Sequence, residues 1–491
     1  MGQIITGLPS TVRRPLVAHS FLYSSGARSL VPIDRRIVVI GIKTSAGTLA
    51  AATPTEVFDT VQSDALGGVG SEVSLMARAA FAQMERDDRA CHLFMVTIAE
   101  PGGGTARVGT LTAAGTATES GTLLYRIAGR LLAIGVVVGD TAATVAAALK
   151  AAIDANGPIL PLTASVAAEV VTWTLRYKGE NGNDVTFRQE RGIAGITIAY
   201  AQTTAGAGTV DLTASLDTLN AKMDGIASAN GDANTVSDLS AHLAAMNTQT
   251  AKKWRRAWMC EPGSISAATV HAGSFNDVAA HVLCCEGVES LPGEVAAATA
   301  AMFHTSTRPN PNLNGRTIVG YPPPDSVAFL DSEIETALAA GVTPLVPVTS
   351  GAGSQIDGQI KLVKLTTTKT LDGAVPVEWP RLPAVSSVGW AIAEQLDAKF
   401  VERFGPTANP DGALVDNTIR GRVRDLVVDV LYTAEAAGWV RNVDDVLGSI
   451  AVEIDGTVAT RVNIALEYVP VVPLDQAAFV HRVSQSVTVN R

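Results

Sequence analysis

The side chains best able to do chemistry in this 491-residue chain are seven histidines and four cysteines, and both sets are scattered. No H-x-x-x-H or H-E-x-x-H spacing occurs, which would place two imidazoles together on a helix for zinc. The cysteines show no C-x-x-C spacing, and the adjacent Cys284 and Cys285 are poorly placed for a sound disulfide. Residues 278–285 predict an apolar helix that buries this pair. We therefore expect no metal site, no cofactor, and reduced, buried thiols.

Two other patterns are typical of anion or nucleic-acid binding, and neither is complete. Residues 67–70 (GGVG) precede an expected helix at Ser71, where backbone N–H groups can receive a phosphate, but no Lys-Ser or Lys-Thr pair follows them. Residues 252–258 (KKWRRAW) mix basic and aromatic side chains, as single-strand binding surfaces do. That cluster is short and leads into an expected strand. We interpret residues 67–70 as a turn. We interpret residues 252–258 as a solvated strand entrance or an intersubunit salt-bridge surface.

The composition excludes several classes of partner. The formal net charge is −10 at pH 7, so the overall field repels polyanions such as nucleic acids and acidic membranes. The 47% hydrophobic and 17% charged residues describe a packed globular chain, long enough for several domains. The most apolar stretch, residues 131–138, ends well before the roughly 20 residues that a membrane span requires. We expect no nucleic-acid partner, no membrane insertion and no export signal.

Short apolar runs rich in β-branched residues recur along the chain and predict strands buried on both faces of a parallel sheet. They are residues 37–41, 92–98, 256–260, 317–321 and 343–348. Helices are expected between them, including 71–84 and a second one that begins with a capping box from Ser332 to Glu335 and ends at Gly341. Strands that alternate with helices indicate a layered α/β domain.

The amino-acid composition changes between residues 101 and 205, which are rich in Ala, Thr, Val and Gly, and this change predicts an inserted domain. It opens with Pro101 and three glycines, which end the preceding strand pattern. A helix is expected at 141–156, a strand at 170–177 and a polar turn at 179–183.

The composition changes again after residue 371, where several prolines predict a connection to a separate C-terminal domain. A helix over 418–437 is expected to bury Ile419, Val423, Leu426 and Val430 on one face and to end at Gly438. Two alternating strands follow, with Asp455-Gly456 between them as a turn. Their apolar positions are Ile450, Val452, Ile454, Val462, Ile464 and Leu466.

Both ends of the chain have the character of strands without a partner in their own domain. Residues 15–23 precede the first core strand, and Val483, Val487 and Val489 alternate with polar residues at the C-terminal end. An unpaired strand aggregates unless another sheet accepts it. These arms therefore predict strand exchange between copies of the chain.

The order of these segments resembles the tail sheath proteins of contractile bacteriophages, closest to the Mu-like branch. The resemblance is carried by residues 13–27 (RRPLVAHSFLYSSGA), 35–43, 61–98, 313–325 (LNGRTIVGYPPPD), 331–348, 360–370 (IKLVKLTTTKT) and 422–440. It covers nearly the whole chain except 101–205. It implies a non-enzymatic subunit that forms stacked hexameric rings around an inner tail tube and contracts to drive the tube through the host envelope for genome delivery.

The resemblance also implies the partners and their contacts. Besides itself, the chain is expected to meet the tail tube, baseplate and tail terminator proteins, in a virion tail assembled in the host cytoplasm. The arm residues expected to exchange are Pro15, Leu16, Val17, Ala18, Ser20, Phe21 and Tyr23 at one end and Phe479, Val483, Val487 and Val489 at the other. Their acceptor is the sheet of residues 450–466 named above. The residues expected to contact the tube are Arg420, Arg422, Arg424, Asp425 and Asp429.

The fold class implied is multidomain α/β: a subtilisin-like layered sheath core, an inserted α+β domain, and a C-terminal α+β domain with exchanged terminal strands. The expected boundaries are 1–30 for the N-terminal arm, 31–100 with 206–371 for the core, 101–205 for an outer-surface insertion, 372–475 for the C-terminal domain and 476–491 for the C-terminal arm. A self-assembling virion decoration or surface-layer protein is the alternative. A subtilisin-like serine hydrolase is a weaker one, because the G-T-S-x-A, H-G-T and D-[ST]-G motifs of its catalytic triad are absent.

Overall fold

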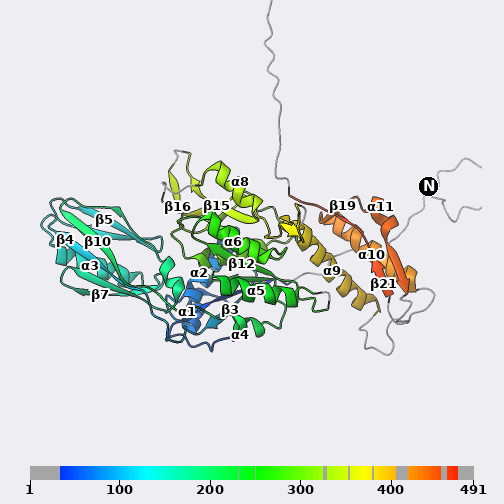
Figure 1. Ribbon diagram of the computed structural model, residues 1–491, viewed down its shortest axis with the longest axis horizontal. Helices are drawn as coiled ribbons and strands as arrows, with labels where there is room; N and C mark the ends of the chain where they lie inside the picture. Colours follow the sequence, from blue (N-terminus) through cyan, green and yellow to red (C-terminus); the bar gives the residue numbers. More distant parts are fainter. Residues whose placement is uncertain are drawn as a thin grey trace, which may run out of the picture. The chain divides into compact units, whose positions relative to one another are not determined.

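The computed structural model of the chain describes residues 34–229, 232–248, 250–324, 329–351, 354–378, 381–404, 419–454 and 462–473 (Figure 1). These residues divide into two compact units, one formed by 34–393 with 470–473 and the other by 394–469. The expected arms, residues 15–23 and 479–489, lie outside the described residues. So does the expected turn at Asp455-Gly456.

The larger unit is built on a nine-stranded mixed sheet with the order β14-β16-β15-β13-β12-β11-β1-β3-β2. Its strands are β1 (Arg36–Ile42), β2 (Thr55–Val57), β3 (His92–Ile98), β11 (Gly225–Ser228), β12 (Arg256–Glu261), β13 (Ala280–Cys284), β14 (Thr317–Val319), β15 (Val342–Thr349) and β16 (Gln355–Leu362). The pairs from β3 through β15 are parallel, whereas β2, β14 and β16 pair antiparallel. In β1, the third strand from one edge, Ile37 is opposite Leu93 on one side and Gly225 on the other.

All five expected runs form strands, but β14 is a partly buried edge strand that pairs antiparallel, not a strand buried on both faces of a parallel sheet as expected. Residues 37–42 of β1 are all buried, so the strand carries apolar side chains toward both faces of the sheet. The helix expected at 278–285 is wrong, because residues 280–284 form the buried strand β13. A short apolar run fits a buried strand as well as a buried helix, and periodicity alone does not separate the two.

Helices cover both faces of this sheet and make the unit three-layered. On one face, α1 (Thr60–Gly67), α2 (Glu72–Asp87) and α7 (Pro292–His304) pack over residues such as Ile37 and Val39. On the other, α4 (Thr213–Asp217), α5 (Ala233–Met246), α6 (Ile265–Phe275) and α8 (Asp331–Ala339) pack over Val38 and Ile40. The mixed, layered α/β core matches the expected class.

The helix ends follow the capping rules with one correction. The Ser71 hydroxyl accepts the Ser74 N–H at 3.2 Å and starts α2 as expected. The capping box expected at Ser332 is wrong: α8 begins two residues earlier, with Leu330 as its N-cap, and the Glu333 carboxylate accepts the Leu330 N–H at 2.8 Å. Gly341 follows α8 with φ +77°, a left-handed conformation that glycine adopts without strain.

Residues 108–204 form two sheets of their own around an apolar core that Leu75 and Leu291 also enter. One sheet has the order β10-β4-β8-β7 and the other has the order β6-β5-β9. Helix α3 packs against strands of both sheets. Their bounds are β4 (Val108–Gly115), β5 (Gly121–Ile127), β6 (Arg130–Val136), α3 (Ala142–Ala155), β7 (Leu162–Ala167), β8 (Val170–Leu175), the 3-10 turn η1 (Glu180–Asp184), β9 (Phe187–Arg191) and β10 (Ile196–Thr204). Figure 1 shows β4, β5, β7, β10 and α3 gathered together. The helix and strand expected in this region are confirmed within two residues at either end.

The chain after residue 370 forms two short strands and then the helices of the smaller unit. The elements are β17 (Leu371–Asp372), β18 (Val375–Pro376), α9 (Pro383–Phe404), α10 (Ile419–Ala436), β19 (Val440–Arg441), α11 (Val443–Val446), the 3-10 turn η4 (Leu447–Ser449), β20 (Ala451–Ile454), β21 (Val462–Ala465) and β22 (Val469–Pro470). The division between the units falls inside α9, at Glu394. The boundary expected at residue 372 therefore precedes the division seen in the structure.

Candidate assembly surfaces

Helix α10 has the buried face that its apolar spacing predicts. Ile419, Val423, Leu426 and Val430 are all less than 5% exposed and form one cluster. Leu396 and Phe400 of α9 pack against this cluster, together with Val452, Ile454 and Val462 of the strands β20 and β21. One apolar stripe thus fixes α10 between a helix and a strand pair.

The five residues expected to contact a tube lie away from this stripe, on its two flanks. At 100° per residue, Arg420 and Arg424 share one flank, whereas Arg422, Asp425 and Asp429 share the other. The first four are exposed, and Asp429 is half-buried. Arg424 donates from Nη2 to the Leu447 carbonyl at 3.1 Å, which holds its stem along η4. The helix therefore presents a basic flank and a mixed flank to its surroundings.

Strands β20 and β21 form the two-stranded antiparallel pair that the alternating sequence predicts. Val452 is opposite Ile464 and Ile454 is opposite Val462, whereas Glu453 and Asn463 are opposite each other on the other face. Val452, Ile454 and Val462 pack against the α10 cluster, but Ile464 is 41% exposed. Of the expected acceptor residues, Ile450 comes just before β20 and Leu466 just after β21. No third strand joins this pair among the described residues. Its two outer backbone edges can therefore receive strands from elsewhere.

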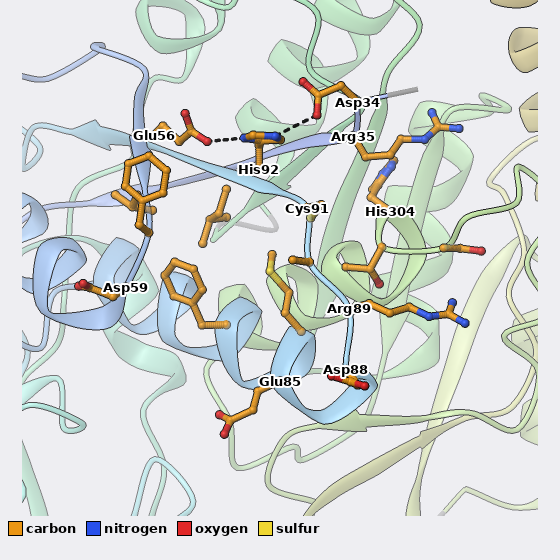
Figure 2. A pocket seen from close by; sticks show the side chains of 18 of the residues that line it. Asp34, Arg35, Glu56, Asp59, Glu85, Asp88, Arg89, Cys91, His92 and His304 are labelled. Atoms are coloured by element: carbon orange, nitrogen blue, oxygen red, sulfur yellow. Dashed lines mark hydrogen bonds and ion pairs between the residues drawn. The ribbon is translucent and has the colours of Figure 1, made fainter. Parts of the chain in front are cut away.

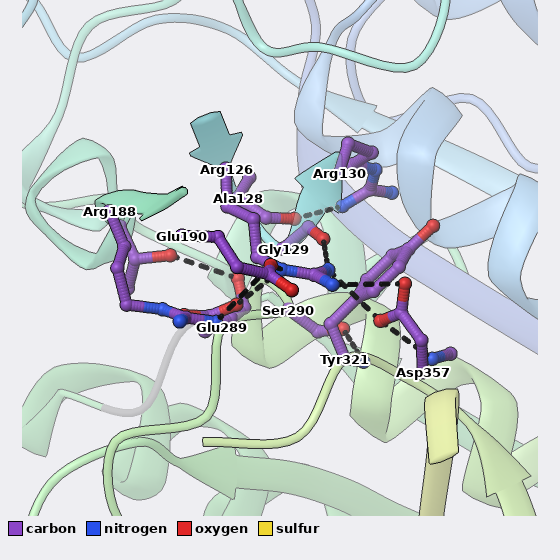
Figure 3. A network of polar contacts seen from close by, with 12 residues as sticks. Arg126, Ala128, Gly129, Arg130, Arg188, Glu190, Glu289, Ser290, Tyr321 and Asp357 are labelled. Carbon is purple, nitrogen blue, oxygen red and sulfur yellow. Dashed lines mark hydrogen bonds and ion pairs between the residues drawn. The ribbon is translucent and has the colours of Figure 1, made fainter. Parts of the chain in front are cut away.

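The inserted residues are fastened to the core by a network of arginines that the sequence analysis missed (Figure 3). Arg126 of β5 makes a two-pronged ion pair with Asp357 of β16, at 2.9 and 3.1 Å, and also pairs with Glu190 of β9. Arg130 of β6 pairs in the same forked manner with the buried Glu294 of α7. Forked pairs of this kind fix orientation as well as distance. No spacing in the sequence connects residues that lie so far apart in the chain.

A cation–π contact, a further ion pair and apolar packing accompany this network across the same junction. The Arg130 guanidinium lies 5.2 Å from the ring centroid of Tyr321, and Arg188 pairs with the buried Glu289. Leu75 of α2 and Leu291 before α7 are buried in the apolar core of the inserted residues. The insertion and the sheet core therefore share part of one hydrophobic cluster.

A buried carboxyl lies at a second point of this junction. Glu72 of α2 accepts the Ile42 N–H at 2.9 Å and the Asn181 side-chain amide at 2.8 Å. Burial raises the pKa of Glu72 from its ordinary value of 4.5 to about 7, although both hydrogen bonds act in the opposite direction. Burial also raises the pKa of Asp184, in η1, to about 7. Protonation of this region is thus linked to how the insertion is held.

The basic residues at 255 and 256 are buried, which corrects the solvated or intersubunit role expected for them. Arg256 donates to the Val278 carbonyl at 2.9 Å, the Pro383 carbonyl at 3.0 Å and the hydroxyls of Ser386 and Ser387. Its guanidinium lies 4.6 Å from the ring centroid of Trp390. Burial lowers the pKa of Arg256 to about 9, so the side chain stays charged at neutral pH. Arg256 therefore connects the start of α9 to strand β12 and to the residues just before β13.

The comparisons with known proteins support the resemblance seen in the sequence. No family model matches the chain. A curated relative, the Mu-like prophage FluMu tail sheath protein of Haemophilus influenzae, is 25% identical over 476 residues, which cover 93% of this chain and 94% of the relative. The resemblance to Mu-like tail sheath proteins is confirmed.

Solved structures of tail sheath proteins share the fold. A sheath tail protein from Desulfitobacterium hafniense matches with a TM-score of 0.50 and 14% identity, over 92% of this chain and 96% of that chain. One from Listeria innocua matches with a TM-score of 0.51 and 14% identity, over 90% and 93%. The alignment with the Haemophilus sheath protein is long enough to extend across residues 101–205, where the order of segments shows only a weak resemblance.

Metal-binding clusters and membrane-spanning helices are both absent from the described residues. These residues contain no group of three or more His, Cys, Asp or Glu side chains arranged to hold a metal ion. Within the same residues, no helix combines the length and the apolar character needed to cross a bilayer. The four cysteines are free; Cys260, Cys284 and Cys285 are buried as expected, but Cys91 is half-exposed.

Proposed function

We propose that the protein is a structural subunit of a contractile tail sheath. It polymerises as stacked hexameric rings around an inner tail tube, and its contraction drives the tube through the host envelope to deliver a genome. The relative named as a tail sheath protein, aligned over nearly all of both chains, supports a structural role in the virion rather than an enzymatic one. Self-association and association with other tail components follow from that role.

The observation that best supports this assembly is the open strand pair of the smaller unit. β20 and β21 are held on α10 by one face, and within the described residues their outer backbone edges pair with no further strand. In the proposal, the arms that contain residues 15–23 and 479–489 of neighbouring subunits add strands to these edges. Backbone hydrogen bonds are insensitive to side-chain sequence, so they hold the subunits together while the lattice changes shape.

The exposed flanks of α10 are the proposed contact with the tail tube. Arg420, Arg422, Arg424, Asp425 and Asp429 supply charges rather than apolar side chains. Exposed ion pairs contribute about 0–1 kcal/mol each. In the proposal, several such pairs together hold α10 against the tail tube in the extended state and separate when the sheath contracts. The same proposal includes contacts with baseplate and tail terminator proteins at the two ends of the stack, and assembly in the host cytoplasm.

The domain assignment is part of the proposal. Residues 31–100 and 206–371 form the subtilisin-like sheath core, 101–205 an outer-surface domain, and 372–475 the domain that faces the tube. The arms are residues 1–30 and 476–491. An outer position suits the insertion because its two ends lie together: Thr105 and Ala207 exchange backbone hydrogen bonds of 3.0 and 3.1 Å. A domain that leaves and re-enters at one point adds to a subunit without interrupting its core.

Negative-stain electron microscopy of the purified chain tests the proposal. The full chain is expected to form hollow tubes of constant bore, and a variant without residues 1–24 is expected to stay dispersed. A variant without residues 1–12 keeps the segment 15–23 and serves as the matched control, expected to form tubes. A full chain that stays monomeric at high concentration would contradict the sheath proposal and favour a decoration protein, which needs a preformed lattice.

A further inference from the structure

The four-stranded sheet of the insertion has two open edges, formed by β10 and β7. Among the described residues, no further strand pairs with either of them. The edges read ITIAYAQTT over residues 196–204 and LTASVA over 162–167, and neither contains a charged residue or a proline. A register shift interrupts β10 only near its end, between Gln202 and Thr204. Exposed edge strands without charges or prolines are templates for pairing with another chain.

The nine-stranded core sheet protects its edge strand β2 in a way that the insertion does not. β2 has only three residues. Figure 2 shows the pocket beside it, in which the His92 side chain lies between the carboxylates of Glu56, on β2, and Asp34. A short edge strand that carries charged groups pairs poorly with another strand. The edges β7 and β10 are longer than β2 and carry no charge.

One row of side chains crosses the sheet of the insertion from edge to edge. Tyr200 of β10 is opposite Leu111 of β4, Leu111 is opposite Val171 of β8, and Val171 is opposite Val166 of β7. The two middle residues are 0% exposed, whereas Tyr200 is 41% exposed and Val166 is 38% exposed. Each end of the row lacks the neighbouring strand that covers the middle. An apolar side chain at each end can therefore cover the other, if the edge of one copy meets the opposite edge of a second copy.

The directions of the strands favour that contact. All three strand pairs in this sheet are antiparallel, so its two edge strands run in opposite directions. A second copy shifted sideways along the row places its β10 antiparallel to β7 of the first copy, with Tyr200 opposite Val166. An aromatic residue opposite a β-branched one is a favourable cross-strand pair. Because the contact joins two different edges, it can repeat from copy to copy.

We propose that this sheet continues from one copy of the chain to the next, with β7 of one copy against β10 of its neighbour and Val166 opposite Tyr200. The inference rests on the self-association proposed above, and it adds a contact between insertions to the contacts made by the arms. β7 has six residues, and an isolated pair of short strands is marginal in water. The contact therefore forms once the arms have brought the copies together, and tubes form without it.

Disulfide cross-linking of the full chain tests this contact. Ser165 and Ala201 are the exposed ends of the adjacent row, which runs through Thr172 and Thr110. In the proposed pairing, Ser165 of one copy is opposite Ala201 of the next, with Cα atoms about 4.5–5.5 Å apart, which suits a disulfide. A chain with Ser165→Cys and Ala201→Cys should give a ladder of covalent oligomers on mild oxidation. Cys91→Ser in all variants removes the half-exposed native thiol, and the other three thiols are buried.

Three controls define the contact. Each single-cysteine chain should give no cross-link, and an equal mixture of the two should stop at dimers, because unlike edges meet. Thr163→Cys with Ala199→Cys is the matched pair: both residues are exposed on the same face, but they are four residues out of register, roughly 13 Å, and should give no ladder. Val166→Lys, added to the chain with Ser165→Cys and Ala201→Cys, should abolish the ladder and leave tubes intact, because a lysine on an edge strand opposes pairing.

Electron microscopy of the same samples separates this inference from the sheath proposal. Tubes without a ladder overturn the inference alone. A ladder from a chain that forms no tubes supports the inference and contradicts the sheath proposal, and a chain that gives neither contradicts both. Dimers from Ala201→Cys alone also overturn the inference, because β10 then pairs with a second β10. A ladder from the matched pair overturns it as well, because the cross-links then report collisions without a fixed register.

Discussion

At the scale of single residues, Arg256 shows how a buried cation holds an element in place without contacting any carboxylate among the described residues. It satisfies two backbone carbonyls and two hydroxyls, and three of these four partners belong to the first turn of α9. Arg256→Lys keeps the charge but loses the planar fork that reaches all of them. We expect it to lower the free energy of unfolding by about 3 kcal/mol, because buried acceptors are left unpaired. Urea unfolding followed by tryptophan fluorescence measures the change.

The matched control is Arg316→Lys. Arg316 is half-exposed and pairs with Asp87 at 3.3 Å on the surface. Its replacement should cost less than about 1 kcal/mol. Equal effects of the two substitutions would show that Arg256 contributes no more than a surface ion pair.

Glu72 makes stability depend on pH. Its pKa is about 7 in the folded chain and 4.5 ordinarily, so between these values the folded state holds a proton that the unfolded state has lost. The contribution is present below pH 4.5 and is lost as the pH rises to about 7, by at most about 1.4 kcal/mol per pH unit for one proton. The unchanged chain should therefore lose stability from pH 5 to pH 7.5, and Glu72→Gln should lose less. Urea midpoints at several pH values measure both slopes.

Glu85→Gln controls for the removal of a carboxylate from α2, since Glu85 is exposed on the same helix. It is expected to leave the pH slope as in the unchanged chain. If Glu72→Gln and the unchanged chain have the same slope, the proton linkage belongs to another group, and Asp184 in η1 becomes the candidate.

At the scale of elements, α10 combines a structural face with a proposed binding face, and the two can be separated by substitution. Arg420→Glu with Arg424→Glu reverses the charge of one exposed flank and leaves the apolar stripe intact. Stability should change by about 1 kcal/mol or less. Binding of the purified chain to isolated tail tubes, measured by co-sedimentation, should be lost.

Lys150→Glu reverses a charge on α3, in the insertion, and is the control for the loss of positive charge. It is expected to co-sediment with tubes as the unchanged chain does. Undiminished binding of the α10 double variant would place the tube contact on another surface.

The elements also show what the sequence could predict. The 3.6-residue spacing of Ile419, Val423, Leu426 and Val430 identified the buried face of α10, because the same period governs the helix and its packing. The strand β13 was mistaken for a helix, since five consecutive buried residues carry no period at all. Arg126 with Asp357 and Arg130 with Glu294 could not be predicted, because each pair joins positions more than 160 residues apart through the tertiary fold.

At the scale of the whole molecule, two features of the insertion have opposite consequences for its removal. Its ends meet at Thr105 and Ala207, so a short Gly-Ser linker can replace residues 104–206 without stretching the chain. Its apolar core also covers Leu75 and Leu291, which are less than 5% exposed in the intact protein. Deletion should therefore expose two leucines and also leave the buried Glu289 and Glu294 without Arg188 and Arg130, their partners in the insertion.

We expect the deleted chain to assemble into tubes but to aggregate, because uncovering each leucine costs about 1.5–3 kcal/mol. The same deletion with Leu75→Ser, Leu291→Ser, Glu289→Gln and Glu294→Gln removes both the exposed leucines and the unpaired carboxylates, and should form tubes of the same bore with little aggregation. Electron microscopy and light scattering distinguish the two outcomes. If the substituted deletion is folded by circular dichroism yet forms no tubes, residues 104–206 carry contacts between subunits, and the insertion does not lie on the outer surface.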